Sequence, residues 1–326
     1  MRLPRSGPEL LERIAQRWRW LAYRIRFHPW TTNELPRILG TIGDYVELTR
    51  LNRPIGIWLL LWPTLWAVWI AGRGSPDAHV FLIFVAGTVL MRSAGCAVND
   101  FADRSLDPHV KRTASRPLAE RRITATEALL VFAVLALSAL MLVLQLNRTT
   151  LLWAVLGAFV AVCYPFVKRF TSLPQLWLGF AFGWGIPMAF EAQLEHVPVV
   201  AWLFFVANVL WVTAYDTLYA MVDRDDDIKI GVRSTAILFG DSDRHIIAIL
   251  QAMTLLALYL AGQRLNMSDW YYGGLVAGAL FFVYQLWLIR ARDRDACFKA
   301  FLNNNYFGMA VFIGILLHYQ FAAHHA

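Results

Sequence analysis

Long apolar runs alternate with short charged loops over most of this chain, and this alternation limits its possible folds more than any other feature. From Ile55 onward, nine segments are apolar and have a length suited to an α-helix that crosses about 30 Å of hydrocarbon. With 58% apolar and only 16% charged residues, the composition fits no ordinary soluble domain. The sequence therefore predicts an all-α, polytopic membrane bundle of nine transmembrane helices. The predicted segments are Ile55 to Ala71, Val80 to Val98, Ala128 to Leu146, Leu151 to Val167, Gln175 to Phe190, Val199 to Thr217, Ile246 to Ala261, Tyr272 to Ile289 and Tyr306 to Phe321.

The lysines and arginines between these segments indicate the orientation of the chain, because short cytoplasmic loops hold an excess of basic residues. The chain up to Arg53 holds ten, and the loops after segments two, four, six and eight hold six, two, four and four. The loops after the odd-numbered segments hold only Arg73, Arg148 and Arg264. We therefore expect a cytoplasmic N-terminus and an external C-terminus in a bacterial inner membrane, with the mitochondrial inner membrane as the alternative.

Residues 1–45 form a basic extension before the predicted membrane domain of residues 46–326. Seven arginines fall within residues 1–30, and apolar residues recur there at helical spacing. This pattern predicts an amphipathic helix on the membrane surface. The segment has no apolar core with a cleavage site, as a secretory signal would have, and a mitochondrial transit peptide ranks second.

Two clusters of acidic and basic residues stand at the ends of apolar segments. The first acidic cluster, Asn99 to Pro117, reads NDFADRSLDPHVKRTASRP and follows the second segment. The second acidic cluster, Tyr215 to Gly231, reads YDTLYAMVDRDDDIKIG and closes the sixth segment. Because the two lie four segments apart, we expect two similar four-helix halves plus one helix around a central cavity, with both clusters on the cytoplasmic side.

The spacing of oxygen-bearing side chains within each cluster suits the binding of a metal and a diphosphate. Asn99, Asp103 and Asp107 follow an i, i+4, i+8 pattern, so a continued helix would place them on one face. Asp223 and Asp227 have the same i, i+4 relation. Mg²⁺ is usually held by one or two carboxylates together with substrate phosphates and water. The two clusters therefore predict Mg²⁺ ions bridged by a diphosphate, with nearby basic residues to neutralise the remaining charge: Lys111, Arg112, Arg116, Lys168 and Arg169.

Other interpretations of these charges remain open. The clusters fit solvated loops that only fix topology, and a membrane transporter would also carry ionisable groups, although nearer the bilayer midplane. A phosphatidyl transferase would use aspartates and Mg²⁺, but the chain lacks a DG-x-x-AR segment. Nucleic acid is not an expected partner, because the basic residues form no continuous stripe with stacking aromatics. Cys96, Cys163 and Cys297 are scattered and are interpreted as packing thiols.

The residues of the two clusters resemble the UbiA superfamily of intramembrane aromatic prenyltransferases. The resemblance covers about residues 45–321 and is close to the 4-hydroxybenzoate polyprenyltransferases of ubiquinone synthesis. It is carried by LNRPIG (51–56), SAGCAVNDFADRSLDPHVKRTASRPL (93–118), YPFVKRF (164–170) and YDTLYAMVDRDDDIKIGVRSTAILFG (215–240).

This resemblance implies a nine-helix bundle and the Mg²⁺-dependent transfer of a polyprenyl chain from its diphosphate to the ring of 4-hydroxybenzoate. The catalytic and metal-binding residues would be Asn99, Asp103, Asp107, Asp223 and Asp227. Further substrate-binding positions would be Asp100, Asp216, Arg53, Lys168 and Arg169. The alternative acceptors within the superfamily are homogentisate, dihydroxynaphthoate and haem. The sequence names no protein partner beyond the bilayer and these substrates.

Three smaller features also lead to predictions. Arg53 stands where the first segment enters the membrane, so we expect its guanidinium to bind the acceptor carboxylate, with a role in topology or a diphosphate contact as alternatives. Pro187 predicts a kink in the fifth segment. The GxxxG pairs Gly179 with Gly183 and Gly274 with Gly278 indicate close helix packing.

Overall fold

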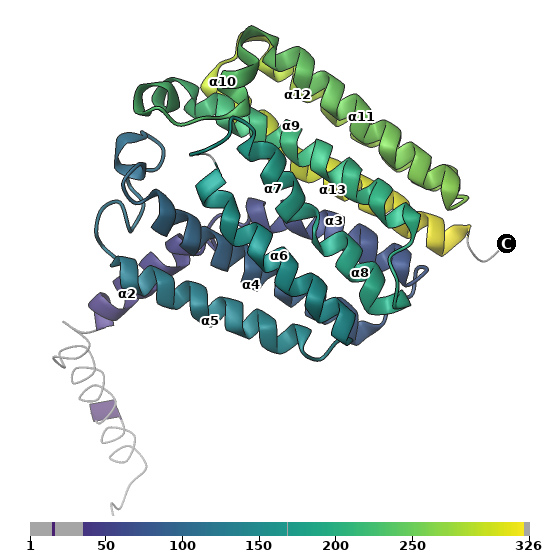
Figure 1. Cartoon of the computed structure of the whole chain (residues 1–326), viewed down its shortest axis with the longest axis horizontal. Helices are drawn as coiled ribbons and strands as arrows, with labels where there is room; N and C mark the ends of the chain where they lie inside the picture. Colours follow the sequence, from purple (N-terminus) through teal and green to yellow (C-terminus); the bar gives the residue numbers. More distant parts are fainter. Residues whose placement is uncertain (1–14, 17–34, 168, 323–326) are drawn as a thin grey trace, which may run out of the picture. The chain divides into compact units, whose positions relative to one another are not determined.

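The computed structural model describes residues 15–16, 35–167 and 169–322 (Figure 1). Its contacts divide the chain into two units, Met1–Glu47 and Leu48–Ala326. α2 spans Leu35–Leu48, and all but its last residue belong to the first unit. The amphipathic helix predicted for residues 1–30 lies outside the described residues except for Ala15 and Gln16, and Lys168 also lies outside them.

The second unit is built from helices, and the described residues contain no strand. Seven helical stretches of the described chain are long and apolar enough to cross a membrane, and α3 is a shorter apolar helix of 17 residues. The predicted all-α membrane bundle is therefore confirmed in outline. The α-helices are α3 (Ile55–Ala71), α4 (Ala78–Asp103), α5 (Ala125–Val143), α6 (Arg148–Val167), α7 (Pro174–Gly183), α8 (Gly185–Leu194), α9 (Val199–Ile230), α10 (Thr235–Phe239), α11 (Asp243–Arg264), α12 (Asp269–Leu288) and α13 (Arg294–Phe321), and the short 3₁₀ turns are η2 (Asp107–His109), η3 (Gly240–Ser242) and η4 (Ile289–Ala291).

The predicted kink in the fifth segment is confirmed as an interruption between α7 and α8 at Trp184. Pro187 has no N–H to donate to the carbonyl of Gly183, and its ring clashes with that carbonyl in a regular helix. The helix therefore stops at Gly183 and restarts at Gly185. The indole N–H of Trp184 donates to the carbonyl of Trp153 at 2.7 Å, which fixes the interruption against α6.

The helices that carry the acidic clusters end differently from the sequence prediction. α9 continues from the predicted end at Thr217 to Ile230 and stops at Gly231, whose φ of 73° is left-handed. α4 ends at Asp103, and Asp107 lies in the separate turn η2. The prediction that one helix carries Asn99, Asp103 and Asp107 is therefore wrong. Pro108 has no N–H to donate to the carbonyl of Arg104, so the helix does not continue through Asp107.

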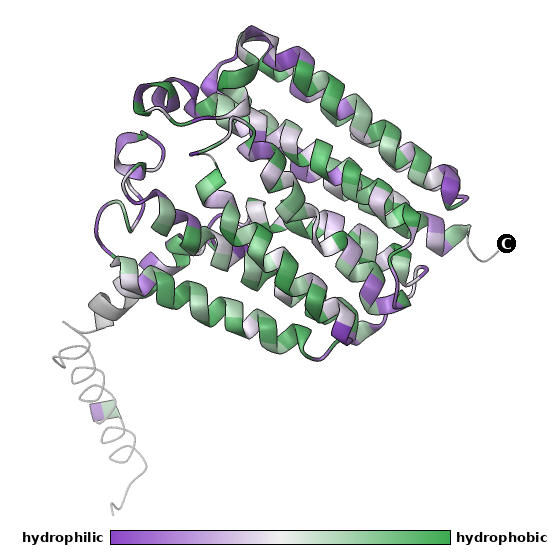
Figure 2. Ribbon diagram, in the orientation of Figure 1, coloured by the Kyte–Doolittle hydropathy of each residue, from purple (hydrophilic) through white to green (hydrophobic). Residues whose placement is uncertain are grey.

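The interior of the second unit is aromatic, and its outer surface is apolar. Trp66 of α3 stacks on Trp211 of α9 with ring centroids 5.4 Å apart, and both side chains are buried. α5 exposes Leu130, Val134 and Leu137, as expected of a helix that faces lipid. Figure 2 shows hydrophobic residues along the middle of the helices and hydrophilic residues at their ends. This distribution is expected of helices that cross a bilayer, with their middles in hydrocarbon and their ends near water.

Both GxxxG pairs lie at close helix contacts, as predicted. A Cβ added to Gly179 would lie 2.9 Å from the carbonyl oxygen of Val209, so α7 packs directly on α9. A Cβ added to Gly274 would lie 2.7 Å from the carbonyl oxygen of Ala310, so α12 packs on α13. Small residues let these backbones approach.

Candidate active site

The two acidic clusters meet at one end of the second unit, which we call the acidic end: the end where α4 and α9 finish. Arg112, in the loop after α4, donates from Nη2 to Asp223 of α9 at 2.6 Å and from Nε at 3.1 Å. The Arg112 guanidinium also lies over the ring of Tyr219, with Cζ 4.5 Å from the centroid. This paired contact joins residues that are 111 positions apart in the chain.

Within the first acidic cluster, Arg116 bridges two carboxylates. Its Nη1 donates to Asp100 and to Asp107, each at 2.9 Å. Asp100 is only 1% exposed and also accepts from Nη2 of Arg50 at 2.9 Å. Burial opposes the charge on Arg116, but the two carboxylates outweigh burial, so the pKa of Arg116 is raised and its side chain stays charged. The cluster is thus a buried and largely neutralised charge network.

Asp103 and Asp216 face the interior from α4 and α9. The side-chain amide of Asn99 donates to Asp103 at 3.2 Å, and Asp103 is 3% exposed. Tyr164 of α6 lies within electrostatic range of both Asp103 and Asp216. One buried carboxylate from each cluster therefore lies near Tyr164 in the interior of the bundle.

The other predicted residues lie nearer the surface of the acidic end. Arg53 and Lys111 are exposed, and Asp227 is half-buried one turn after Asp223. Arg169 is exposed, but its Nη2 donates to the carbonyl of Ala102 at 2.6 Å and so reaches the end of α4. The structure thus brings Arg112, Arg116 and Arg169 to the acidic clusters, whereas Arg53 points to solvent.

The sequence analysis missed Arg92, which lies inside the bundle two turns before Asn99. Its Nη1 donates to the sulfur of Cys96 at 2.9 Å, and its Cζ lies 5.7 Å from the ring centroid of Phe182. A Cβ at Gly56 would come within 2.5 Å of this guanidinium, so α3 also approaches it closely. Within the described chain, Nε of Arg92 is buried and makes no hydrogen bond. The signal was available, because Arg92 is the one lysine or arginine inside the nine predicted spans.

Arg92 has two neighbouring polar atoms that also lack hydrogen bonds in the described part of the chain. These are the hydroxyl oxygens of Ser93 and Tyr215, whose side chains are 2% and 1% exposed. Tyr215 lies within electrostatic range of Arg92. A cation and a phenol with unused hydrogen-bonding capacity therefore lie deeper in the bundle than Asp103 and Asp223.

The chemistry of the carboxylates fits Mg²⁺. Among the residues that the structure describes, no three His, Cys, Asp or Glu side chains are grouped so as to hold a metal alone. Mg²⁺ is bound in proteins through one or two carboxylates plus substrate phosphates, so a set of oxygen donors split between two helices suits an ion that arrives with a diphosphate. The donors predicted for it are Asn99, Asp103, Asp107, Asp223 and Asp227.

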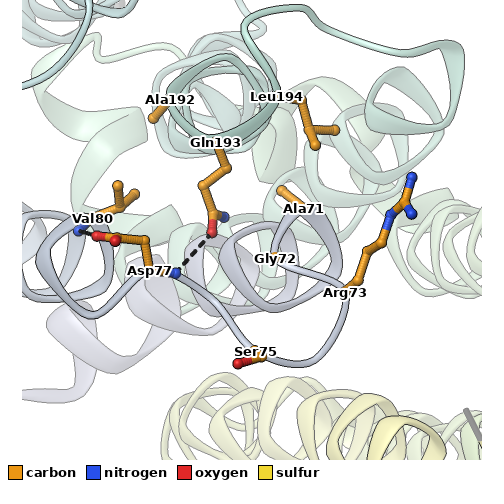
Figure 3. A pocket seen from close by; sticks show the side chains of 9 residues that line it. All are labelled: Ala71, Gly72, Arg73, Ser75, Asp77, Val80, Ala192, Gln193 and Leu194. Atoms are coloured by element: carbon orange, nitrogen blue, oxygen red, sulfur yellow. Dashed lines mark hydrogen bonds between the residues drawn. The ribbon is translucent and has the colours of Figure 1, made fainter. Parts of the chain in front are cut away.

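A pocket of about 470 Å³ lies far from the acidic clusters, at the junction of α3, α4 and α8 (Figure 3). Figure 3 shows the side chain of Gln193, from α8, reaching toward Asp77. Its side-chain oxygen accepts a hydrogen bond from the backbone N–H of Asp77 at 3.3 Å. The pocket lies at the start of α4, whereas Asp103 is the last residue of this helix of 26 residues, about 39 Å long. None of the predicted site residues lines it.

Comparisons with known proteins show which family the chain resembles. A family model described as the UbiA prenyltransferase family matches residues 60–312. The 4-hydroxybenzoate octaprenyltransferase of Pseudomonas syringae pv. tomato is 55% identical over 285 residues, which are 87% of this chain and 96% of that protein. The protein of the same name from Aeromonas salmonicida is 57% identical over 275 residues, covering 84% of this chain and 95% of that protein.

Solved structures share the fold. A UbiA homolog from Aeropyrum pernix K1 has a TM-score of 0.71 at 24% identity and covers 80% of this chain and 97% of its own. A UbiA homolog from Archaeoglobus fulgidus bound to GPP and Mg²⁺ has a TM-score of 0.63 at 15% identity and covers 82% and 99%. The family match, the curated relatives and the shared fold lead to one conclusion: this chain belongs to the UbiA prenyltransferase family.

Proposed function

We propose that this chain transfers a polyprenyl group from polyprenyl diphosphate to 4-hydroxybenzoate, ortho to the hydroxyl, in ubiquinone synthesis. The observation that carries the reaction type is the Arg112–Asp223 contact, which joins the two acidic clusters at the acidic end. The acceptor follows from relatives that are 55% and 57% identical and are named for 4-hydroxybenzoate. Their name also favours an octaprenyl chain over other lengths.

The diphosphate end of the donor is proposed to bind at the acidic end with Mg²⁺ held by Asn99, Asp103, Asp107, Asp223 and Asp227. When bound, the metal neutralises charge that develops on the leaving diphosphate. The described basic residues of the same end supply fixed positive charge toward the phosphates: Lys111, Arg112, Arg116 and Arg169. From the sequence alone, Lys168 is proposed to do the same. The Archaeoglobus fulgidus homolog of the same fold is bound to GPP and Mg²⁺, which supports a prenyl diphosphate and Mg²⁺ as ligands.

No protein nucleophile is required for this transfer. The allylic carbon–oxygen bond of the donor breaks and its electron pair stays with the diphosphate. The ring carbon ortho to the acceptor hydroxyl bonds to the allylic carbon, and the proton on that ring carbon passes to the released diphosphate. Asp100 and Asp216 are buried beside this site, and Asp100 balances the charges of Arg50 and Arg116. Burial of the site keeps water from the allylic cation, which would otherwise be hydrolysed.

The carboxylate of 4-hydroxybenzoate needs a cationic partner in a dry site. The sequence favours Arg53, but this side chain is exposed. Arg92 is supported by its position inside the bundle, its unused Nε and the neighbouring Tyr215 hydroxyl. We therefore propose Arg92 as the carboxylate anchor and assign Arg53 to the membrane surface.

Arg92→Lys is expected to raise KM for 4-hydroxybenzoate roughly 10- to 100-fold, because lysine keeps the charge but loses the forked hydrogen bonds to a carboxylate. KM for the polyprenyl diphosphate should change little. Arg53→Lys is the matched control and should leave both constants near wild type. Steady-state kinetics with each substrate varied in turn provide the measurement. The opposite pattern, with only Arg53→Lys affecting 4-hydroxybenzoate, would return the anchor to Arg53.

The acceptor assignment is tested with purified protein in liposomes, Mg²⁺ and octaprenyl diphosphate. Equal concentrations of 4-hydroxybenzoate, homogentisate and dihydroxynaphthoate are offered, and products are identified by mass. The expected product is 3-octaprenyl-4-hydroxybenzoate. A product formed from another acceptor alone would keep the reaction class and replace the substrate.

We propose nine membrane crossings: the seven long helical stretches, α3, and α7 with α8 acting as one broken crossing. They form two similar four-helix halves plus α13. The N-terminus and the acidic end then face the cytoplasm of a bacterial cell, with residues 1–45 as an amphipathic surface segment. The distribution of lysine and arginine supports this orientation.

This topology predicts which single cysteines a membrane-impermeant thiol reagent can reach in intact cells. Ala78→Cys, in an exposed position at the start of α4, should be labelled from outside. Ser115→Cys and Ser242→Cys, both exposed near the acidic end, should be labelled only after the membrane is opened. Labelling of positions 115 and 242 from opposite sides would separate the two clusters and rule out a shared site.

A further inference from the structure

A second charge cluster holds the end of α9 on the side away from Arg112. Its centre is Asp243, the first residue of α11, which is fully buried at 0% exposure. Arg224 of α9 donates to this carboxylate through Nη2. Arg292, between η4 and α13, donates to it from Nε at 3.0 Å. One buried carboxylate thus joins α9, α11 and the loop before α13.

Arg224 connects this charge cluster to the candidate active site, because it is the next residue after Asp223 on α9. Arg224 directly follows Asp223, and successive residues of a helix point about 100° apart, so the two side chains leave α9 in different directions. Asp223 contacts Arg112 of the first half of the bundle, and Arg224 contacts Asp243 of the second half. The last turns of α9 are therefore held from two sides, which fixes their rotation about the helix axis.

Arg292 has an unusual backbone conformation and makes a second hydrogen bond beside this contact. Its backbone φ of 56° lies in the left-handed region, which residues other than glycine seldom adopt. Its Nη2 also donates to the carbonyl of Asp241 at 2.6 Å. With this backbone conformation, the Arg292 side chain reaches Asp243 and closes the buried cluster.

We propose that Asp243 is a positioning residue for prenyl transfer: through Arg224 it sets the direction in which Asp223 and Asp227 face the diphosphate. The inference rests on the proposed function and adds to it a residue that contacts neither the metal nor the diphosphate but orients the residues that do. Removal of the Asp243 charge lets the end of α9 turn, which weakens the binding of Mg²⁺ and the diphosphate. The acceptor, bound deeper at Arg92, is unaffected.

Asp243→Asn is expected to raise KM for the polyprenyl diphosphate, and the Mg²⁺ concentration at half-maximal rate, by at least about tenfold. KM for 4-hydroxybenzoate should stay within about twofold of wild type. Asp243→Glu, which keeps the carboxylate, should recover most of the loss. The matched control is Asp225→Asn, which removes an exposed carboxylate from the last turns of α9 and should behave as wild type.

A binding readout separates positioning from a general loss of structure. Farnesyl thiodiphosphate, an unreactive donor analogue, is titrated with Mg²⁺ while the melting temperature is followed, because a ligand that binds the folded state raises it. Half-saturation should move at least about tenfold higher in Asp243→Asn. If Asp243→Asn cannot be purified in folded form, Arg292→Lys is tested in the same way. Its half-saturating concentration of the analogue should rise by a smaller factor.

Each result decides the role of Asp243. Wild-type kinetics and wild-type analogue binding in Asp243→Asn would overturn the inference and leave the proposed function intact. A lower melting temperature with unchanged KM values would also overturn it, because the cluster would then only stabilise the fold. Failure of the wild-type protein to form any product would remove the proposed function and this inference together.

Discussion

Replacing Asp223 with alanine is expected to lower kcat/KM for prenyl transfer about 10²- to 10³-fold while the protein stays folded. Asp223 lies where the two acidic clusters meet, so its loss removes a proposed metal ligand and releases Arg112. The Arg112 side chain is 28% exposed and can still lie over Tyr219, so it does not become a fully buried unpaired charge. For this reason activity should fall much further than stability.

Initial rates with saturating 4-hydroxybenzoate and varied octaprenyl diphosphate give the result for Asp223→Ala. Asp225→Ala is the control, because Asp225 lies on the same turn but is exposed and pairs with Arg294. It should keep nearly full activity. Asp103→Ala, Asp107→Ala and Asp227→Ala should resemble Asp223→Ala, and excess EDTA should abolish turnover in all of them. Full activity in Asp223→Ala would remove the second acidic cluster from the mechanism.

Arg116→Met is expected to cause the largest loss of stability, about 3–5 kcal/mol in the free energy of unfolding. Arg116 is the shared partner of Asp100 and Asp107, whose side chains are 2% and 8% exposed. Methionine fills a similar volume but leaves Asp107 without this ion pair and Asp100 with one arginine fewer. Buried carboxylates that lose a partner destabilise the fold far more than surface ions do.

The unfolding of Arg116→Met is followed in detergent by heat or by denaturant titration. The control is Arg122→Gln, which breaks the pair with Glu120, where the two side chains are 35% and 47% exposed. An exposed pair contributes at most about 1 kcal/mol, so this variant should unfold like the wild type. Equal small losses in both variants would show that the Arg116 network does not stabilise the first acidic cluster.

The sequence predicted the membrane helices well where hydropathy decides their ends. α3 begins and ends where predicted, at Ile55 and Ala71, because Pro54 precedes it and Gly72 follows it. α9 was predicted 13 residues too short, because hydropathy cannot follow a helix beyond the bilayer into a charged segment. The same limit hid the turn at Asp107, which depends on the backbone effect of Pro108 and not on hydrophobicity.

The sequence identified the acidic clusters but not the partners of their side chains. It favoured Arg53 near the site, whereas the arginine before α3 that pairs with Asp100 is Arg50, one turn earlier. The direction of these side chains depends on the loop before α3, where Arg50 has a left-handed φ of 60°. Asp243 was not predicted either, because its three-way contact joins elements that only the fold brings together.

The ratio of diphosphate released to prenylated 4-hydroxybenzoate formed tests most directly whether one water-poor site performs the transfer. Purified protein in liposomes, with octaprenyl diphosphate, Mg²⁺ and ring-labelled 4-hydroxybenzoate, should give a ratio of about one, because the buried site protects the allylic cation from water. Both quantities should fall to background in Asp223→Ala. Release of diphosphate without aromatic product, or product formation that is unchanged in Asp223→Ala, would contradict a single site built from both acidic clusters.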